Sequence, residues 1–242
     1  KIVVVYRSSP CRSVCVVHAS IPRRWNTLSK TPLPMNSNNS APSPTAQRIA
    51  LTGGIGSGKS HVCAIIARTG APIFYADPAA KHIIRTDPQV RAALTDLVGA
   101  EVYDAQGQLV KSVLAAFLCQ GRAHSTQVDA IVHPRVEQAW RDFVSAHADA
   151  PYIYMECALL FEVGWQRLVD HTVLVSCPEE ERIRRVMARD AIDRATACRW
   201  IALQMPEAEK ARLADVVLIN DGQAPILSQL EQYQLIPSSF SE

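Results

Sequence analysis

The residues of this chain that are best suited to chemistry form a glycine-rich loop. The loop consists of Gly53, Gly54, Ile55, Gly56, Ser57, Gly58, Lys59 and Ser60 and fits the pattern Gly-x4-Gly-Lys-Ser/Thr. In such a loop, successive backbone N–H groups point at one anion, and the N-terminus of the following helix adds partial positive charge. Lys59 would reach the β- and γ-phosphates of a nucleoside triphosphate, and the Ser60 hydroxyl would contact Mg²⁺. An apolar run precedes the loop and a helical pattern follows it, so we prefer this interpretation to a glycine turn without a ligand.

Two acidic residues follow apolar runs at places where a parallel sheet would present its ligands. Asp77 comes directly after the run 72–76, and Glu156 ends the run 152–156. At the carboxyl edge of such a sheet, Asp77 would be a general base that accepts a hydroxyl proton during phosphoryl transfer. The alternative is structural, because Asp77 followed by Pro78 also suits the N-cap and first position of a helix. For Glu156, a water-mediated contact to Mg²⁺ and a structural role remain equally open.

The segment 178–212 carries three arginines that an α-helix would place on one face. They are Arg182, Arg185 and Arg189, at positions i, i+3 and i+7. They could form a solvated face, held by Glu181–Arg185 and Asp193–Arg189 pairs. They could instead belong to a lid that closes over the triphosphate and stabilises charge in the transition state, which the position of the segment favours. His133, before Pro134, is a further candidate for the wall of a substrate site.

These residues must be positioned by alternating strands and helices. Strands are expected at 48–52, 72–76, 152–157, 170–176 and 215–220, and helices at 78–85, 87–98, 110–119, 123–131 and 134–147. The predicted fold class is α/β, a three-layer P-loop NTPase fold with a five-stranded parallel sheet, a helical substrate-binding insertion and a helical lid.

The domain organisation follows from these elements. We expect a nucleotide-binding core at 47–77, 150–177 and 213–235, an insertion at 78–149 and a lid at 178–212. Residues 1–46 contain prolines and many serines, a composition typical of disorder, and Met35 offers an internal start. We therefore expect a disordered leader or non-native segment there, with an organelle transit peptide as the weaker alternative.

Composition limits the classes of partner. The formal charge of +2 arises because residues 1–46 carry six basic and no acidic residues, whereas the 19 basic and 23 acidic residues of the rest leave it at −4. A nucleic-acid partner is therefore not expected, and arginines interrupt the apolar runs of the leader, so neither a membrane span nor a signal sequence fits. The seven scattered cysteines suggest reduced thiols in a cytoplasmic protein. We expect a monomer, with an oligomer as the alternative.

From Arg48 to about Tyr233 the chain resembles the dephospho-CoA kinases. Besides the loop, the matching blocks are Ala76-Asp77, Val132-His133-Pro134, Leu159-Leu160-Phe161-Glu162, Val186-Met187-Ala188-Arg189-Asp190, Gln204-Met205-Pro206 and Ala214-Asp215-Val216-Val217-Leu218-Ile219-Asn220-Asp221-Gly222. Several blocks in the right order over most of the chain are more specific than the loop alone.

The resemblance implies transfer of the γ-phosphate of ATP to the 3′-hydroxyl of the dephospho-CoA ribose, the last step of coenzyme A synthesis. By position, Asp77 resembles the family's base, Lys59 and Ser60 its phosphate and Mg²⁺ residues, and Arg185 its lid arginine. Asn220 falls where the family meets the adenine of ATP, and the insertion would bind the CoA moiety.

Some positions depart from the family pattern. Tyr75 replaces an aspartate, Ala158 replaces a proline, and Glu156 lies where aspartate is common. His61 stands where threonine usually follows the loop, so a hydroxyl contact to the α-phosphate would be lost. His61 and Arg189 are still counted among the expected nucleotide-binding residues, and Asp77 and His133 among those that bind the acceptor.

Other functions remain as alternatives. Another P-loop nucleoside or nucleotide kinase would keep the loop and lid but lack the further blocks. A GTP-driven switch would need Asn-Lys-x-Asp after a late strand, where this chain has Ile219-Asn220-Asp221-Gly222. A pseudo-enzyme that only binds ATP is disfavoured because Lys59, Ser60 and Asp77 are all present.

Overall fold

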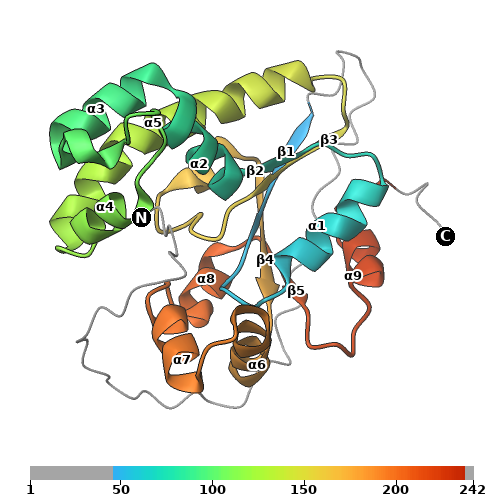
Figure 1. Ribbon diagram of the computed structural model, residues 1–242. Helices are drawn as coiled ribbons and strands as arrows, with labels where there is room; N and C mark the ends of the chain where they lie inside the picture. Colours follow the sequence, from blue (N-terminus) through green and yellow to red (C-terminus); the bar gives the residue numbers. More distant parts are fainter. Residues whose placement is uncertain (1–45, 238–242) are drawn as a thin grey trace.

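A five-stranded parallel sheet forms the centre of the protein (Figure 1). The computed structural model describes residues 46–237, so the expectation for the leader lies almost wholly outside the described residues. The strands are β1 (Gln47–Thr52), β2 (Ile73–Tyr75), β3 (Tyr152–Glu156), β4 (His171–Ser176) and β5 (Val216–Ile219). Their order across the sheet is β2-β3-β1-β4-β5, and every neighbouring pair is parallel. The prediction of five parallel strands is confirmed, with boundaries that differ by at most one residue.

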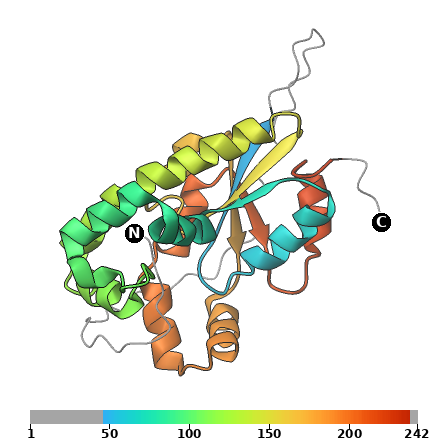
Figure 2. The ribbon, with the colours of Figure 1, turned by 45° about the horizontal axis from the view of Figure 1, so that its top comes forward.

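Alternating strand residues build two separate cores, one on each face of the sheet. On β1, Ile49 and Leu51 pack with α1 (Lys59–Arg68) and α9 (Ile226–Gln232). Ala50, between them, faces the opposite core, which contains buried residues of the long helices. Because successive side chains of a strand point to opposite faces, these apolar runs are buried on both sides. The result is three layers, which Figures 1 and 2 show with α1 and α9 together on one side of the sheet.

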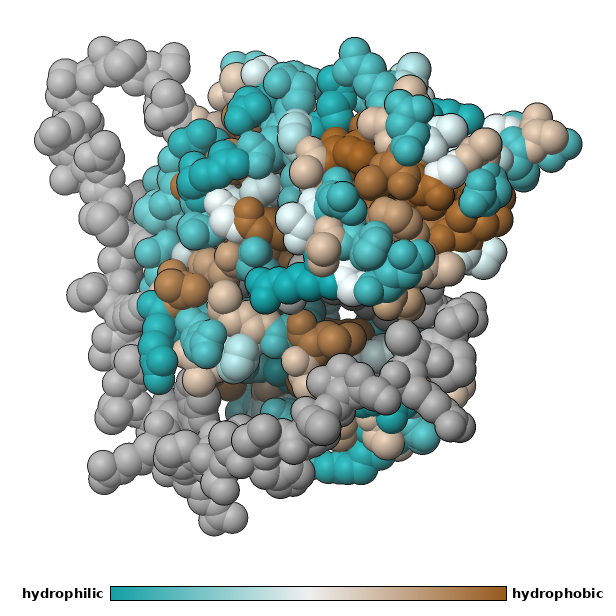
Figure 3. Space-filling view, turned by 90° about the vertical axis from the view of Figure 1, so that its left-hand side faces the viewer, coloured by the Kyte–Doolittle hydropathy of each residue, from teal (hydrophilic) through white to brown (hydrophobic). Residues whose placement is uncertain are grey.

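The other face of the sheet carries the helices that lie between β2 and β3. They are α2 (Ala76–Thr86), α3 (Pro88–Val98), α4 (Lys111–Leu118) and α5 (Arg122–Ala146), with a short 3₁₀ turn at Ala100–Val102. Viewed from their side, the surface is mostly hydrophilic, with one larger area of gathered apolar side chains (Figure 3).

Helix α5 corrects one expectation. The sequence predicted two helices separated at His133-Pro134, but a single helix runs from Arg122 to Ala146 with Pro134 inside it. Proline removes one backbone hydrogen bond of a helix. Here Val128, Val132, Val136 and Trp140, four residues apart, are all buried, and the packing of this stripe holds the helix together through the proline.

Helix α2 corrects a second expectation. It begins at Ala76 rather than Pro78, and its N-cap position is Tyr75. Asp77 therefore lies in the first turn, and its carboxylate forms an ion pair with Lys81 at 2.5 Å. The interpretation of Asp77 as the helix cap is wrong.

The expected lid is helical. It contains α6 (Glu179–Asp190), α7 (Arg194–Ala202) and α8 (Glu207–Leu213), and a 3₁₀ turn at Trp165–Leu168 lies earlier, between β3 and β4. Ile183, Val186 and Ala197 form a small apolar cluster of their own. Ile55, at the tip of the glycine loop, packs against this cluster. The tip of the loop is thus in apolar contact with α6 and α7.

Two composition-based expectations can be compared with residues 46–237. Cys63, Cys157 and Cys177 are free and buried, as expected of reduced thiols in a core. Cys119 is exposed and Cys198 is only partly buried, so a core position is wrong for Cys119. Cys11 and Cys15 lie outside the described residues. Within 46–237, no helix combines the length and apolar character that crossing a bilayer requires.

Candidate active site

The glycine loop connects the carboxyl end of β1 to α1, and its backbone requires glycine at two crowded positions. Gly56 and Gly58 have φ of 79° and 93°, in the left-handed region. A Cβ on Gly56 would lie 2.7 Å from the Arg182 carbonyl oxygen, and one on Gly58 only 2.0 Å from Asn220 Nδ2. The loop is therefore held between α6 and the end of β5, with no room for a side chain at either contact.

We expect Gly58→Ala to weaken ATP binding by at least about tenfold, because the methyl group must displace the Asn220 carboxamide and break its hydrogen bond to the loop. Gly70→Ala is the matched control, since Gly70 is also left-handed, with φ of 79°, but has nothing within 4 Å of an added Cβ. Both variants carry the cost of about 1–2 kcal/mol for a left-handed alanine. Equilibrium titration with ATP should separate them, and equal affinities in the two variants would contradict this account of the loop.

Asn220 and Arg185 converge on the carbonyl of Ser57. Asn220 Nδ2 donates to the Ser57 oxygen at 2.8 Å, and Arg185 Nη1 lies 3.5 Å from the same oxygen. Arg185 Nη2 also donates to the backbone oxygen of Asn220 at 3.3 Å. Because the Ser57 carbonyl points toward these donors, it does not compete with the backbone N–H groups on the opposite side of the loop, where an anion could bind. The Asn220 carboxamide, expected at the adenine, is thus bonded to the phosphate loop.

Lys59 and Glu156 form a partly buried pair at the root of the loop. Lys59 Nζ lies 3.8 Å from Glu156 Oε1 and donates to the Gly53 carbonyl at 2.9 Å. Burial lowers the pKa of Lys59 and raises the pKa of Glu156, while the opposite charge of each partner counteracts both shifts. The lysine is therefore held in place by acceptors that an incoming phosphate could replace.

Asp77 lies beside the same pair, on the first turn of α2. Its side chain is about half exposed, and its charge contributes to the raised pKa of Glu156. Lys81, one turn later, binds the Asp77 carboxylate. Lys81 was not among the expected site residues, although its i,i+4 spacing from Asp77 was a usable signal.

The arginines of α6 differ sharply in environment. The Glu181–Arg185 pair is present, with Nε to Oε1 at 2.8 Å, and hydrogen bonds from Arg184 and Arg185 lower the pKa of Glu181 to about 2. Arg189 pairs with Asp190 at 2.6 Å and not with Asp193 as expected. Asp193 instead caps α7 by accepting from the Thr196 backbone N–H.

Arg182 is buried and serves the loop rather than a solvated face. Its Nε donates to the Ile55 carbonyl at 3.0 Å, and its Nη1 pairs with Glu207 Oε2 at 2.6 Å. Glu207 in turn accepts from the Ser176 hydroxyl at the end of β4. Sequence reasoning missed this role because an arginine at a helical spacing carries no sign of burial.

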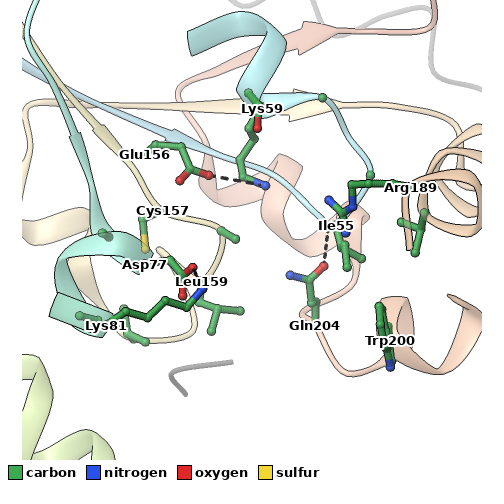
Figure 4. A pocket seen from close by; sticks show the side chains of 18 of the residues that line it. Ile55, Lys59, Asp77, Lys81, Glu156, Cys157, Leu159, Arg189, Trp200 and Gln204 are labelled. Atoms are coloured by element: carbon green, nitrogen blue, oxygen red, sulfur yellow. Dashed lines mark hydrogen bonds and ion pairs between the residues drawn. The ribbon is translucent and has the colours of Figure 1, made fainter. Parts of the chain in front are cut away.

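A cavity of about 540 Å³ brings most of the expected site residues together (Figure 4). Those that line it are Ile55, Gly56, Gly58, Lys59, Ser60, Asp77, His133, Glu156, Arg185 and Arg189. Gly53, Gly54, Ser57, His61 and Asn220 are not among the lining residues, and His61 is exposed on α1.

The cavity also has aromatic walls. His133 packs edge-on against Trp165 with 5.3 Å between ring centroids, and burial lowers its pKa, which favours the neutral imidazole. Trp200 of α7 and Gln204 close the lid side. Trp165, Trp200 and Gln204 were not identified as site residues from the sequence. The two tryptophans gave no signal there, whereas Gln204 belongs to one of the blocks that match the family and could have been identified from it.

The oxygen donors of the cavity suit Mg²⁺ that arrives on phosphates. Within residues 46–237, no group of three or more His, Cys, Asp or Glu side chains could hold a metal by itself. The Ser60 hydroxyl and the carboxylates of Asp77 and Glu156 nevertheless line one cavity. Magnesium prefers oxygen ligands and commonly takes several of them from substrate phosphates, so these residues fit the ion.

Comparisons with known proteins decide which kinase family this site belongs to. The model of the dephospho-CoA kinase family matches residues 47–225. The chain belongs to the dephospho-CoA kinase family. A dephospho-CoA kinase of Bacteroides fragilis is 40% identical over 185 residues, which cover 76% of this chain and 90% of the relative.

Solved structures share the fold of this chain. The crystal structure of a Thermus thermophilus protein, 32% identical, superposes with a TM-score of 0.70 over 82% of this chain and all of that chain. Dephospho-CoA kinase from Campylobacter jejuni has a TM-score of 0.56 over 78% and 94% of the two chains, and at 18% identity it supports the fold alone. Family membership makes the chain an ATP-dependent phosphotransferase, as expected.

Proposed function

We propose that this dephospho-CoA kinase transfers the γ-phosphate of ATP to the 3′-hydroxyl of the dephospho-CoA ribose, with Asp77 as the general base. The observation that carries the proposal is the meeting of the phosphate loop, Arg185 and Asp77 in one cavity at the carboxyl edge of the sheet. Phosphoryl transfer depends mainly on positioning and on charge stabilisation, and these groups supply both.

In this proposal the loop and the lid bind ATP. The backbone N–H groups of the loop and Lys59 hold the β- and γ-phosphates, and Arg185 contributes positive charge from α6. Arg185 already lies over the loop, bonded to the Ser57 and Asn220 carbonyls, which supports this role. Arg189 adds a second cation at the lid side.

Asp77 would act on the acceptor. Its carboxylate accepts the proton of the ribose hydroxyl while the oxygen of that hydroxyl bonds to the γ-phosphorus, and the bond from the γ-phosphorus to the bridging oxygen of ADP breaks. Its location on the first turn of α2, about half exposed and facing the cavity, leaves it accessible to a substrate. The His133 and Trp165 wall belongs to the acceptor side in this proposal.

Magnesium completes the proposed site. Ser60 would hold the ion through its hydroxyl, with Glu156 or Asp77 binding through water, and the ion would neutralise charge on the phosphates. Helices α2 to α5 would bind the rest of dephospho-CoA, and we retain a cytoplasmic monomer as the proposed state.

The test is an acceptor comparison with the purified protein, ATP and Mg²⁺. Dephospho-CoA, AMP and adenosine are supplied separately, and ADP release and acceptor mass are measured. We expect rapid phosphorylation of dephospho-CoA and at least about a hundredfold lower kcat/KM for the other two. Equal or faster phosphorylation of AMP or adenosine would contradict the proposal and support another nucleotide kinase.

A further inference from the structure

Gln204 occupies a position in the cavity that neither the loop motif nor the arginine pattern explains. It lies in the turn between α7 and α8 and lines the cavity together with Ile55, Arg189 and Trp200. Figure 4 shows this group on one side of the cavity and Asp77 with Lys81 on the other.

The orientation of the Gln204 carboxamide is fixed by a backbone donor. The N–H of Ile55 donates to Gln204 Oε1 at 2.7 Å. Only the oxygen of a carboxamide can accept this hydrogen bond, so the NH₂ group must occupy the other position. In Figure 4 this nitrogen points toward the Asp77 side of the cavity. Within residues 46–237 it has no hydrogen-bond partner.

The backbone around Gln204 is held as firmly as its side chain. The N–H of Met205 donates to Glu162 Oε1 at 3.0 Å. The same carboxylate pairs with the buried Lys210 at 2.9 Å, and Lys210 also donates to the Ala158 carbonyl. A side chain held from both sides keeps its NH₂ group in one place before a ligand arrives, which is what a preorganised binding group requires.

The charges around the cavity indicate what kind of group the NH₂ of Gln204 would bind. Lys59 and Arg185 line the cavity at the loop, whereas the carboxylates of Asp77 and Glu156 lie on the far side from Gln204 in Figure 4. Asp190, also a lining residue, is paired with Arg189. The NH₂ group of Gln204 therefore faces a cavity that also contains Lys59 and Arg185, beside the tip of the phosphate loop. Such a set of hydrogen-bond donors and cations suits an oxyanion.

We propose that Gln204 is a further phosphoryl-binding residue, whose NH₂ group donates to a phosphoryl oxygen while its Oε1 holds Ile55. The inference rests on the proposed function. The oxygen belongs either to the γ-phosphate of ATP, including the group in transfer, or to the pyrophosphate of dephospho-CoA. Gln204 then binds the ligand and also holds Ile55 at the tip of the loop.

Two substitutions separate the donor from the tie to Ile55. Gln204→Glu retains an oxygen for the Ile55 N–H but replaces the NH₂ group by an anionic oxygen. Gln204→Met removes both the donor and the acceptor at similar length. Gln232→Glu is the matched control for added charge, because Gln232 is exposed on α9, outside the insertion and outside the residues that line the cavity.

The measurements are Tm, kcat and KM for both substrates, and the Kd of ATP and ADP. We expect Gln204→Glu to retain the wild-type Tm and to lose about 10- to 100-fold in kcat/KM, the effect of a hydrogen bond to a charged group. Weaker ATP with unchanged ADP binding identifies the γ-phosphate, a raised KM for dephospho-CoA identifies the pyrophosphate, and a fall in kcat alone identifies the group in transfer. Gln232→Glu should resemble wild type in all of these kinetic and binding constants.

The proposal is overturned if Gln204→Glu stays within threefold of wild type for both substrates while Gln204→Met is impaired, because Gln204 then only ties the loop. It is also overturned if Gln204→Glu loses as much Tm as Gln204→Met. An inactive wild-type protein would count against the proposed function alone, and the Kd values of ATP, ADP and dephospho-CoA for Gln204→Glu would still decide the role of Gln204.

Discussion

Asp77→Asn is expected to lower kcat by at least about a hundredfold while Tm and ATP affinity change little. Asparagine has nearly the same shape but cannot accept the proton of the ribose hydroxyl, and general-base assistance contributes roughly 10²–10⁴ in rate. The fold does not depend on this carboxylate, because the N-cap position of α2 is Tyr75. Only the exposed pair with Lys81 is lost, a contribution of about 0–1 kcal/mol.

Glu231→Gln is the control for Asp77→Asn. Glu231 is an exposed carboxylate on α9, on the opposite face of the sheet from α2 to α5 and outside the cavity lining, so its substitution neutralises one surface carboxylate without touching the site. Steady-state kinetics and thermal melts of both variants decide the matter. An Asp77→Asn enzyme within fivefold of the wild-type kcat would remove Asp77 from the role of base.

Arg185→Ala is expected to lower kcat by about 10³-fold, at the lower end of the range for an arginine that stabilises charge on a transferring phosphoryl group. Ground-state ATP binding should weaken much less, because the loop and Lys59 remain. The guanidinium contacts two carbonyls at the loop and lines the cavity, which places it where that charge develops.

Arg184→Ala provides a close comparison on the same helix. Arg184 binds the same Glu181 carboxylate as Arg185 but is 69% exposed, so its removal changes the same carboxylate and net charge without reaching the cavity. Rapid-quench measurement of the chemical step and ATP titration should distinguish the two variants. Equally small effects would contradict the role of Arg185 in transfer and indicate that its side chain only pairs with Glu181 at the surface.

The sequence was sufficient to predict the sheet and the position of its loop. The strands are short apolar runs that are buried on both faces; in β4, for example, Val173 and Leu174 lie in opposite cores. Such a run can be recognised in the sequence without knowing which strands lie beside it. Helix boundaries were harder to predict from the sequence. The proline rule failed at Pro134, because the buried stripe of α5 outweighs one lost hydrogen bond.

Residues that act through distant partners could not be predicted. Arg182 and Lys210 are charged but buried, and each is paired with a glutamate far along the chain. Gln204 matters only because the turn before α8 meets Ile55 at the loop tip. A single sequence contains no information about such contacts until the elements are placed in space.

Of the four departures from the family pattern, Tyr75 and His61 lie outside the cavity, whereas Ala158 and Glu156 line it. Tyr75 is 42% exposed and His61 is exposed on α1, and neither lines the cavity. Ala158 lines the cavity and accepts from the buried Lys210 through its carbonyl, a contact that does not depend on its side chain.

The most direct test of the central claim is the position of the new phosphate on the product. The protein is incubated with ATP, Mg²⁺ and dephospho-CoA, and the product is examined by ³¹P NMR with correlation to the ribose protons. We predict one new phosphomonoester coupled to the 3′ proton, formed at least about a hundredfold more slowly by Asp77→Asn. A phosphate on the 2′-hydroxyl, or no phosphomonoester from the wild-type protein, would contradict the account.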